Sequence, residues 1–144
     1  MEAAVAGCFA ENGPAVLAAS RSFMTILVAD DSEKNRELLR TVLSHLGHAV
    51  TEATNGRQAV ELAVELAPEL MIFDLQMPEL DGFGAMREVR AMDRFRETPV
   101  LALTAYAMEG DREKALAAGF TSYLTKPLRL ADLRAELARW TVQA

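Results

Sequence analysis

Short apolar runs alternate with amphipathic stretches along the chain from Thr25 onward. Three runs are apolar almost throughout, as expected of strands buried on both faces: 25–29, 70–73 and 100–103. Weaker runs around Val50 and Tyr123 are typical of edge strands. Apolar residues recur at helical spacing over 38–46, 59–66, 83–90, 107–118 and 130–140. Because strands alternating with helices form parallel βαβ units, the pattern predicts an α/β fold: a doubly wound five-stranded parallel sheet in the order 2-1-3-4-5.

The first 23 residues lack this alternation. They are Ala-rich and are interrupted by Gly13-Pro14, and the acidic Glu2 stands where a secretory signal would carry basic residues. We therefore expect residues 1–23 to be an N-terminal extension or a linker, and residues 24–144 to form one domain. On this interpretation, removing the extension leaves the domain folded.

Composition narrows the possible partners and compartments. The net charge is −6, which argues against binding to nucleic acid or to an anionic membrane through bulk electrostatics. Cys8 is the one cysteine, so no internal disulfide can form, and a reducing cytoplasmic location is expected. No apolar run approaches the roughly 18 residues of a membrane span.

Reactive side chains follow four of the predicted strands. Asp30 and Asp31 follow the first, Asp74 the third, Thr104 the fourth and Lys126 the fifth. Ligands of open α/β sheets bind at this edge, near the point where the strand order reverses. Three carboxylates crowded there repel one another, and the oxygen ligands that they offer suit Mg²⁺. A carboxylate can also accept a phosphoryl group, whose oxygens the ammonium and hydroxyl groups would stabilise.

Taken one at a time, these residues have simpler interpretations. Asp30 and Asp31 could cap the following helix, Thr104 could be a turn residue, and Lys126 could be a solvated surface lysine. Asp74 is harder to explain in this way, because it directly follows a buried run. The conjunction of all five residues at one sheet edge favours a functional site.

Four sequence motifs resemble those of the receiver domains of response regulators in two-component signalling, of the CheY-like, flavodoxin-like fold. The resemblance runs from about Thr25 to about Val142. The four matching motifs are Val28-Ala29-Asp30-Asp31, Asp74-Leu75-Gln76-Met77-Pro78 with Asp81-Gly82, Ala102-Leu103-Thr104-Ala105, and Tyr123-Leu124-Thr125-Lys126-Pro127.

The resemblance implies a role for each matching residue in phosphorylation. Asp74 corresponds to the phosphoacceptor, with Lys126 and Thr104 contacting the phosphoryl group. Asp30 and Asp31 correspond to the acid pair that holds the Mg²⁺ cofactor together with Asp74, and Asp31 is the more direct ligand of the pair.

Three further positions correspond to parts of the metal site and of the switch. Gln76 matches the position that gives a backbone carbonyl to the metal. Tyr123 matches the aromatic residue that, with Thr104, changes conformation on phosphorylation. Pro127 matches a proline that follows a cis peptide bond.

The resemblance also implies partners. We expect a signalling switch rather than an enzyme with a separate substrate, phosphorylated by a histidine kinase or a histidine phosphotransfer protein. Its output would pass to an unknown downstream protein, since no output domain follows in this sequence. The expected signalling face comprises the fourth helix, the fifth strand and the fifth helix, around Tyr106, Met108, Tyr123 and Arg129.

Three alternatives remain open at this stage. The chain could be a receiver excised from a hybrid histidine kinase, since Asn35-Arg36 resembles the subgroup that contains both stand-alone receivers and those of hybrid kinases. An aspartyl-nucleophile phosphatase of the haloacid dehalogenase type would carry a second Asp where this chain has Gln76. A nucleotide-binding flavodoxin-like or Rossmann domain would need a Gly-rich loop where this chain has Asp30-Asp31-Ser32.

Overall fold

The computed structural model describes residues 24–105 and 110–141. Its five strands form one parallel sheet in the order β2-β1-β3-β4-β5. The strands are β1 (Thr25–Ala29), β2 (Ala49–Ala53), β3 (Leu70–Asp74), β4 (Val100–Thr104) and β5 (Ser122–Thr125). The helices are α2 (Glu33–His45), α3 (Gly56–Leu66), α4 (Gly82–Arg90), the short 3₁₀ helix η1 (Asp93–Phe95), α5 (Asp111–Ala117) and α6 (Leu130–Thr141). The predicted fold class and strand order are confirmed, and residues 1–23 lie outside the described part.

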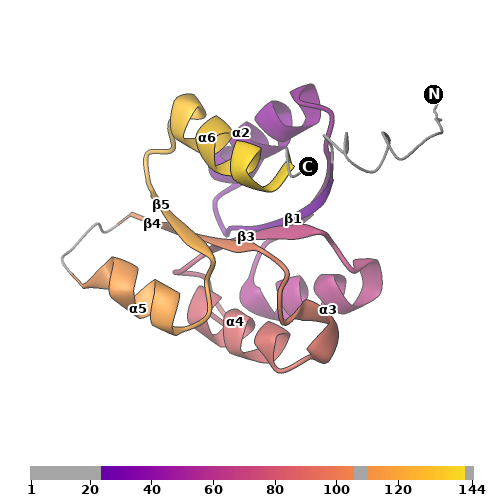
Figure 1. Ribbon diagram of the computed structural model, residues 1–144, viewed down its shortest axis with the longest axis vertical. Helices are drawn as coiled ribbons and strands as arrows, with labels where there is room; N and C mark the ends of the chain where they lie inside the picture. Colours follow the sequence, from indigo (N-terminus) through magenta and orange to yellow (C-terminus); the bar gives the residue numbers. More distant parts are fainter. Residues whose placement is uncertain (1–23, 106–109, 142–144) are drawn as a thin grey trace.

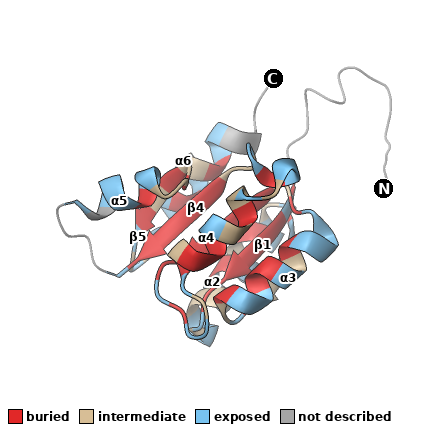
Figure 2. Ribbon diagram, turned by 90° about the horizontal axis from the view of Figure 1, so that it is seen from below, coloured by how far each residue is buried: buried red, intermediate tan, exposed pale blue. Residues whose placement is uncertain are grey.

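Helices cover both faces of the sheet, with α2 and α6 on one face and α3, α4 and α5 on the other (Figure 1). Each face has its own core of buried apolar side chains. Every residue of β3 and β4 is buried, whereas β2 and β5 at the edges are only partly so. Figure 2 shows the buried β4 in red between the helices. A strand covered on both faces needs apolar side chains at every position, which explains the continuous runs in the sequence.

Side chains that cap helix N-termini hold the loops at the carboxyl edge of the sheet. Ser32, Asn55 and Asp81 each accept a hydrogen bond from a backbone N–H in the first turn of the helix that follows. α2 and α3 begin within four residues of the strands that precede them, whereas a longer loop joins β3 to α4. The pairing of the strands holds their carboxyl ends next to one another.

Two details differ from the sequence pattern. Of the helix predicted over 107–118, the described part is Asp111–Ala117, and it begins directly after Gly110 in a left-handed conformation with φ of 96°. The sequence pattern predicts Leu130 in the last apolar stripe, but this residue is 52% exposed. It lies at the first position of α6, before the helix packs on the sheet. Tyr106 and Met108, expected on the signalling face, lie outside the described residues.

Across residues 24–105 and 110–141, no helix combines the length and the apolar character that crossing a membrane requires.

Gly82 brings α4 against the end of β3. A Cβ at this position would overlap the carbonyl oxygen of Asp74 and would lie 2.8 Å from the Cα of Leu75. Both are backbone atoms, so they cannot move aside without shifting the strand end. A glycine at this position is what allows α4 to start so close to Asp74.

We therefore expect Gly82→Ala to lower the free energy of unfolding by about 2–3 kcal/mol, as measured by urea denaturation. Gly84→Ala is the matched control, because its Cβ would meet mainly the mobile end of the Leu80 side chain. Alanine there also gains about 1 kcal/mol of helix propensity. Equal destabilisation by the two substitutions would contradict the role given to Gly82.

Candidate functional site

The acid pair follows β1 directly, and its two members have different surroundings. Asp30 is fully buried, whereas Asp31 is exposed. The backbone N–H of Ser32 donates a hydrogen bond of 2.9 Å to Oδ1 of Asp30. The first carboxylate is thus held by the backbone, and the second is open to solvent.

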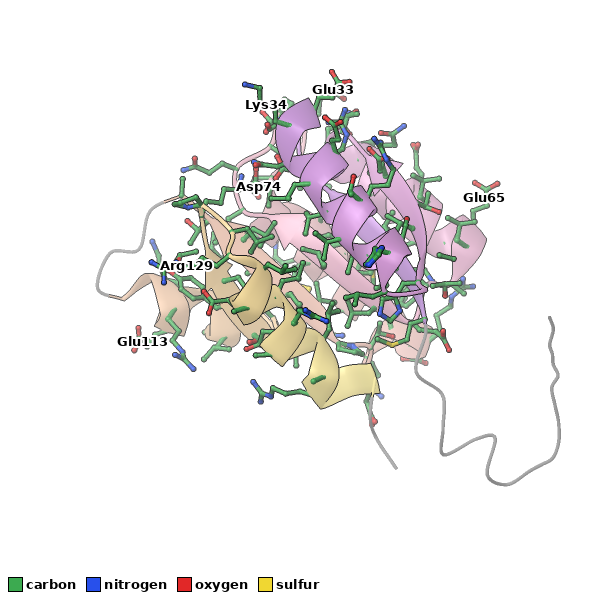
Figure 3. The ribbon with its side chains drawn as sticks, turned by 90° about the horizontal axis from the view of Figure 1, so that it is seen from above. Glu33, Lys34, Glu65, Asp74, Glu113 and Arg129 are labelled. Atoms are coloured by element: carbon green, nitrogen blue, oxygen red, sulfur yellow. The ribbon has the colours of Figure 1, made fainter. Side chains whose placement is uncertain are left out.

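Asp74 is the last residue of β3 and is only 3% exposed. Its Oδ1 accepts a hydrogen bond of 3.1 Å from the backbone N–H of Gln76, and its Oδ2 lies 3.0 Å from Nζ of Lys126. In Figure 3, Asp74 lies at the end of the sheet where α2 begins with Glu33 and Lys34. The side chain of Gln76 is exposed in the loop that follows.

Lys126 connects two of the three carboxylates. Its ammonium nitrogen lies 3.0 Å from Asp74 Oδ2 and 3.2 Å from Asp30 Oδ2. Its backbone N–H donates to the carbonyl of Thr104, and the peptide bond to Pro127 is cis. The simpler interpretation of Lys126 as a solvated surface lysine therefore does not describe this side chain, which is 19% exposed.

Thr104 and Tyr123 occupy diagonal positions on neighbouring strands. Thr104, 3% exposed, ends β4, and Ala102 two residues earlier pairs with Tyr123 of β5. Since side chains alternate along a strand, Thr104 and Tyr123 lie on the same face of the sheet. The ring of Tyr123 packs against the core beneath α3, α4 and α5. Thr104 thus ends the strand next to that of Asp74, and it shares a face of the sheet with the edge-strand aromatic Tyr123.

Burial and the neighbouring charges change the pKa of Asp74. Burial raises it from 3.8 to about 6, and the nearby charge of Asp30 adds to this effect. The Gln76 amide and the Lys126 ammonium group lower the pKa of Asp74, but they do not outweigh burial. Burial alone would lower the pKa of Lys126, yet the hydrogen bond to Asp74 and the charge of Asp30 leave it raised. The Asp74 carboxylate thus binds a proton more readily than an ordinary aspartate, and a cation beside it would favour its charged form.

The donor set at this edge fits a hard divalent cation. One carboxylate oxygen from each of Asp30, Asp31 and Asp74 can be chosen so that all lie within 4.8 Å of one another. The buried Oδ2 of Asp30 has its ion-pair contact with Lys126, but it accepts no hydrogen bond of good geometry from the described residues. A cation held only by oxygen ligands would satisfy that atom, and Mg²⁺ prefers such ligands.

Sequence reasoning did not place Arg36 at this site. Its guanidinium donates a hydrogen bond of 2.8 Å to the backbone carbonyl of Asp30. A signal for this contact exists in the sequence, because side chains of a helix lean toward its N-terminus. An arginine in the second turn can therefore reach the strand end from which the helix started.

The response regulator receiver domain family matches residues 26–138 of this sequence. This chain belongs to that family. A protein of Leptolyngbya boryana, described only as an uncharacterized 14.6 kDa protein, is 46% identical over 110 residues, which are 76% of this chain and 84% of that protein. The signal transduction histidine-protein kinase BarA of Shigella flexneri is 37% identical over 121 residues, 84% of this receiver but only 13% of BarA.

Solved receiver structures share the fold. The receiver domain of sensor histidine kinase PA1611 from Pseudomonas aeruginosa PAO1, with a magnesium ion coordinated in its active site cleft, is 40% identical with a TM-score of 0.76. The alignment covers 82% of this chain and 97% of that one. The receiver domain of Ssk1 from Saccharomyces cerevisiae, in complex with the histidine phosphotransfer protein Ypd1, is 28% identical with a TM-score of 0.78, over 83% and 90% of the two chains. Membership of this family sets aside the phosphatase and nucleotide-binding alternatives.

The raised pKa of Asp74 predicts how Mg²⁺ affinity depends on pH. Asp74 has to lose its proton before it can bind a cation, so affinity falls as pH drops through about 6. From about pH 7.5 to about pH 5 we expect roughly a tenfold loss, measured by isothermal titration calorimetry with MgCl₂. Asp74→Asn has no such proton and should lose most of this dependence. Equal affinity of the wild-type protein at both pH values would contradict the prediction.

Proposed function

We propose that this receiver accepts a phosphoryl group from a phosphohistidine onto Asp74, in the presence of Mg²⁺, and that phosphorylation switches a protein-binding surface. The observation that carries the proposal is the surroundings of Asp74. A buried carboxylate ends the central strand, an ammonium group lies 3.0 Å away, and two further carboxylates complete an oxygen-only cluster. A purely structural ion pair has no need of the second and third acid.

Phosphoryl transfer requires a nucleophile that is ionised. With a pKa of about 6, Asp74 is mostly ionised near neutral pH. A carboxylate oxygen of Asp74 would form the new bond to phosphorus while the bond from phosphorus to the donor imidazole breaks. The imidazole nitrogen keeps the electron pair of that bond. The product is an aspartyl phosphate.

The groups around Asp74 are suited to the charge of the phosphoryl oxygens. Lys126 is close enough to pair with them after transfer, and the hydroxyl of Thr104 can donate a hydrogen bond to one of them. Asp30, Asp31 and Asp74, with the backbone carbonyl of Gln76, would hold Mg²⁺. When bound, this ion supplies positive charge that neutralises the carboxylates and the incoming phosphoryl group.

Phosphorylation would be transmitted through Thr104 and Tyr123 to the surface formed by α5, β5 and α6. The phosphoryl group adds about −1.5 to −2 charges beside Thr104. A shift of Thr104 toward it makes room on the face that it shares with Tyr123, which biases an existing equilibrium between two surface shapes. The exposed Arg129, just before α6, belongs to this surface.

The proposed phosphodonor is a histidine kinase or a histidine phosphotransfer protein. The Ssk1 receiver, which shares this fold, was solved in complex with the phosphotransfer protein Ypd1. We place the reaction in the cytoplasm and in the domain formed by residues 24–144, with residues 1–23 as an extension or linker. The acidic net charge of −6 is consistent with a protein partner rather than nucleic acid or a membrane surface.

A second possibility is that this receiver is one module of a hybrid histidine kinase. The alignment with BarA, in which the matched region is 13% of the kinase, favours it. The match to 84% of the small Leptolyngbya boryana protein favours a stand-alone receiver. The neighbouring genomic sequence decides between them, since a kinase domain encoded in frame before residue 1 would establish the hybrid.

Asp74→Asn should abolish phosphorylation and leave the fold intact, because Asn is nearly isosteric with Asp. The protein is incubated with MgCl₂ and phosphoramidate, a small donor with a phosphorus–nitrogen bond, and labelling is read by mass spectrometry. Asp93→Asn is the control, since the Asp93 side chain is 95% exposed and pairs only loosely with Arg96 at 3.9 Å. Uptake of phosphate by Asp74→Asn at the wild-type rate would show that another residue is the nucleophile.

Thr104→Ala should separate phosphorylation from the switch. We expect the variant to accept phosphate, because Asp74 and Lys126 are unchanged, but Tyr123 should keep its unphosphorylated environment. The side-chain resonances of Tyr123 are compared by NMR before and after phosphorylation, with Thr104→Ser as the variant that keeps the hydroxyl. A normal response of Tyr123 in the alanine variant would rule out Thr104 as the sensing group.

A further inference from the structure

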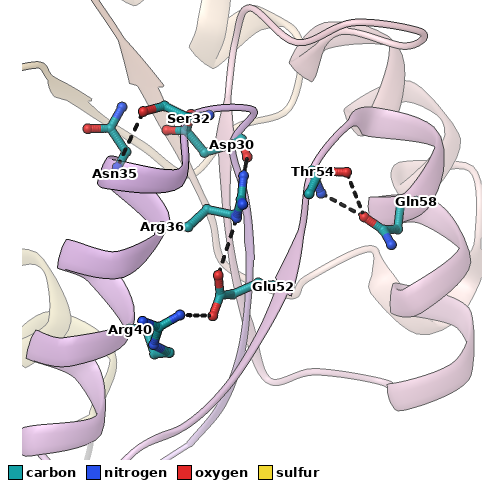
Figure 4. A network of polar contacts seen from close by, with 8 residues as sticks. All are labelled: Asp30, Ser32, Asn35, Arg36, Arg40, Glu52, Thr54 and Gln58. Atoms are coloured by element: carbon teal, nitrogen blue, oxygen red, sulfur yellow. Dashed lines mark hydrogen bonds and ion pairs between the residues drawn. The ribbon is translucent and has the colours of Figure 1, made fainter.

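A chain of polar contacts connects the edge strand β2 to the buried acid of the metal site (Figure 4). The guanidinium of Arg36 donates to the backbone carbonyl of Asp30 at 2.8 Å and pairs with Oε1 of Glu52 at 3.2 Å. The other oxygen of Glu52 lies 2.7 Å from Arg40. Arg36 and Arg40 come from α2, and Glu52 comes from β2. Side chains of both elements therefore form the network that reaches Asp30.

From this network we infer that Arg36 is a positioning residue for the metal site: it fixes the backbone at Asp30 so that the Asp30 carboxylate points toward the cation. The inference rests on the proposed function, because it assumes that Asp30 is a ligand of Mg²⁺.

The backbone of Asp30 needs such a support because it lies just beyond the sheet. The parallel ladder of β1 ends at Ala29, which pairs with Ala53 on one side and with Phe73 on the other. The N–H of Asp30 still donates to the carbonyl of Ala53 at 3.1 Å. Its carbonyl accepts a hydrogen bond from Arg36 instead of from a strand. The Arg36 side chain thus replaces the hydrogen bond that a neighbouring strand would supply.

Arg36 is itself held in place. Its side chain is 14% exposed, and Glu52 beside it is 25% exposed. An ion pair at this depth is screened less by salt than one on the open surface. Because the guanidinium has several donors in a fixed plane, it can bind the Asp30 carbonyl and Glu52 at the same time. A lysine has one ammonium group and cannot span both acceptors in the same way.

The positive charge of Arg36 and its proposed positioning role predict opposite effects of removing this residue on Mg²⁺ binding. Arg36 places a positive charge near a cation site, so its removal by itself would relieve repulsion and strengthen Mg²⁺ binding. A positioning role predicts weaker binding in the same variant, because the Asp30 carboxylate loses its preferred orientation. Groups that orient metal ligands typically change affinity by about 10- to 100-fold. The sign of the change therefore separates the two explanations.

The experiment compares Arg36→Met, Arg36→Lys and Arg40→Met in the full chain. Titration calorimetry with MgCl₂ gives the dissociation constant of each, and urea denaturation without metal gives its stability. We expect Arg36→Met to bind Mg²⁺ about tenfold more weakly than the wild-type protein. Arg36→Lys should also bind more weakly although its charge is unchanged. Arg40→Met loses a positive charge beside the same Glu52 but no contact with Asp30, and it should stay within about twofold.

Phosphorylation by phosphoramidate provides a second readout that a merely structural role would not change. The Arg36 variants should need more Mg²⁺ for half of the maximal rate, while the rate at saturating Mg²⁺ stays near the wild-type value. If Arg36→Met does not fold, the comparison of Arg36→Lys with the wild-type protein carries the test.

Two failures can be told apart. Absence of Mg²⁺ binding by the wild-type protein would overturn the proposed metal site and this inference with it. Normal binding by the wild-type protein, with unchanged or higher affinity in the Arg36 variants, would overturn only the role of Arg36. Equal weakening by Arg36→Met and Arg40→Met would also overturn it, because the effect would then not depend on the Asp30 carbonyl.

Discussion

The electrostatic constraint at the carboxyl edge of the sheet governs much of this structure. Asp30, Asp31 and Asp74 bring three carboxylates together, and two of them are buried. Burial of a charged carboxylate is unfavourable, and it raises the pKa of Asp74, to which the charge of Asp30 adds. Lys126 offsets part of the cost by contacting both buried acids. The remaining negative charge is what gives the site its preference for a cation.

The doubly wound topology is what makes this arrangement possible. The strands that carry the acids, β1 and β3, are neighbours at the point where the strand order reverses, and β4 and β5 bring Thr104 and Lys126 alongside. Two apolar cores, one on each face, hold the strand ends rigidly. A carboxylate cluster on flexible loops could relax by moving apart, whereas strand ends packed on both sides cannot. The fold thus maintains a strained charge distribution that a cation or a phosphoryl group can relieve.

The polar network around Asp30 extends this constraint to the edge of the sheet. The parallel ladder supplies hydrogen bonds up to Ala29, and the next carbonyl is bound by a side chain of α2. That side chain is in turn held by Glu52 on β2. In our proposal, the position of the metal ligand Asp30 therefore depends on side chains of α2 and β2, although neither element carries a proposed ligand.

The sequence by itself determined the fold class, the strand order and the identity of the chemical groups at the site. It could do so because burial on both faces demands continuous apolar runs, and parallel strands present their carboxyl ends at one edge. It did not determine that Lys126 bridges two acids, that Gly82 lies against the backbone of Asp74, or that Arg36 reaches the Asp30 carbonyl. Each of these contacts joins residues from different elements. Their distances depend on how helices and strands pack, which a local pattern along the chain does not encode.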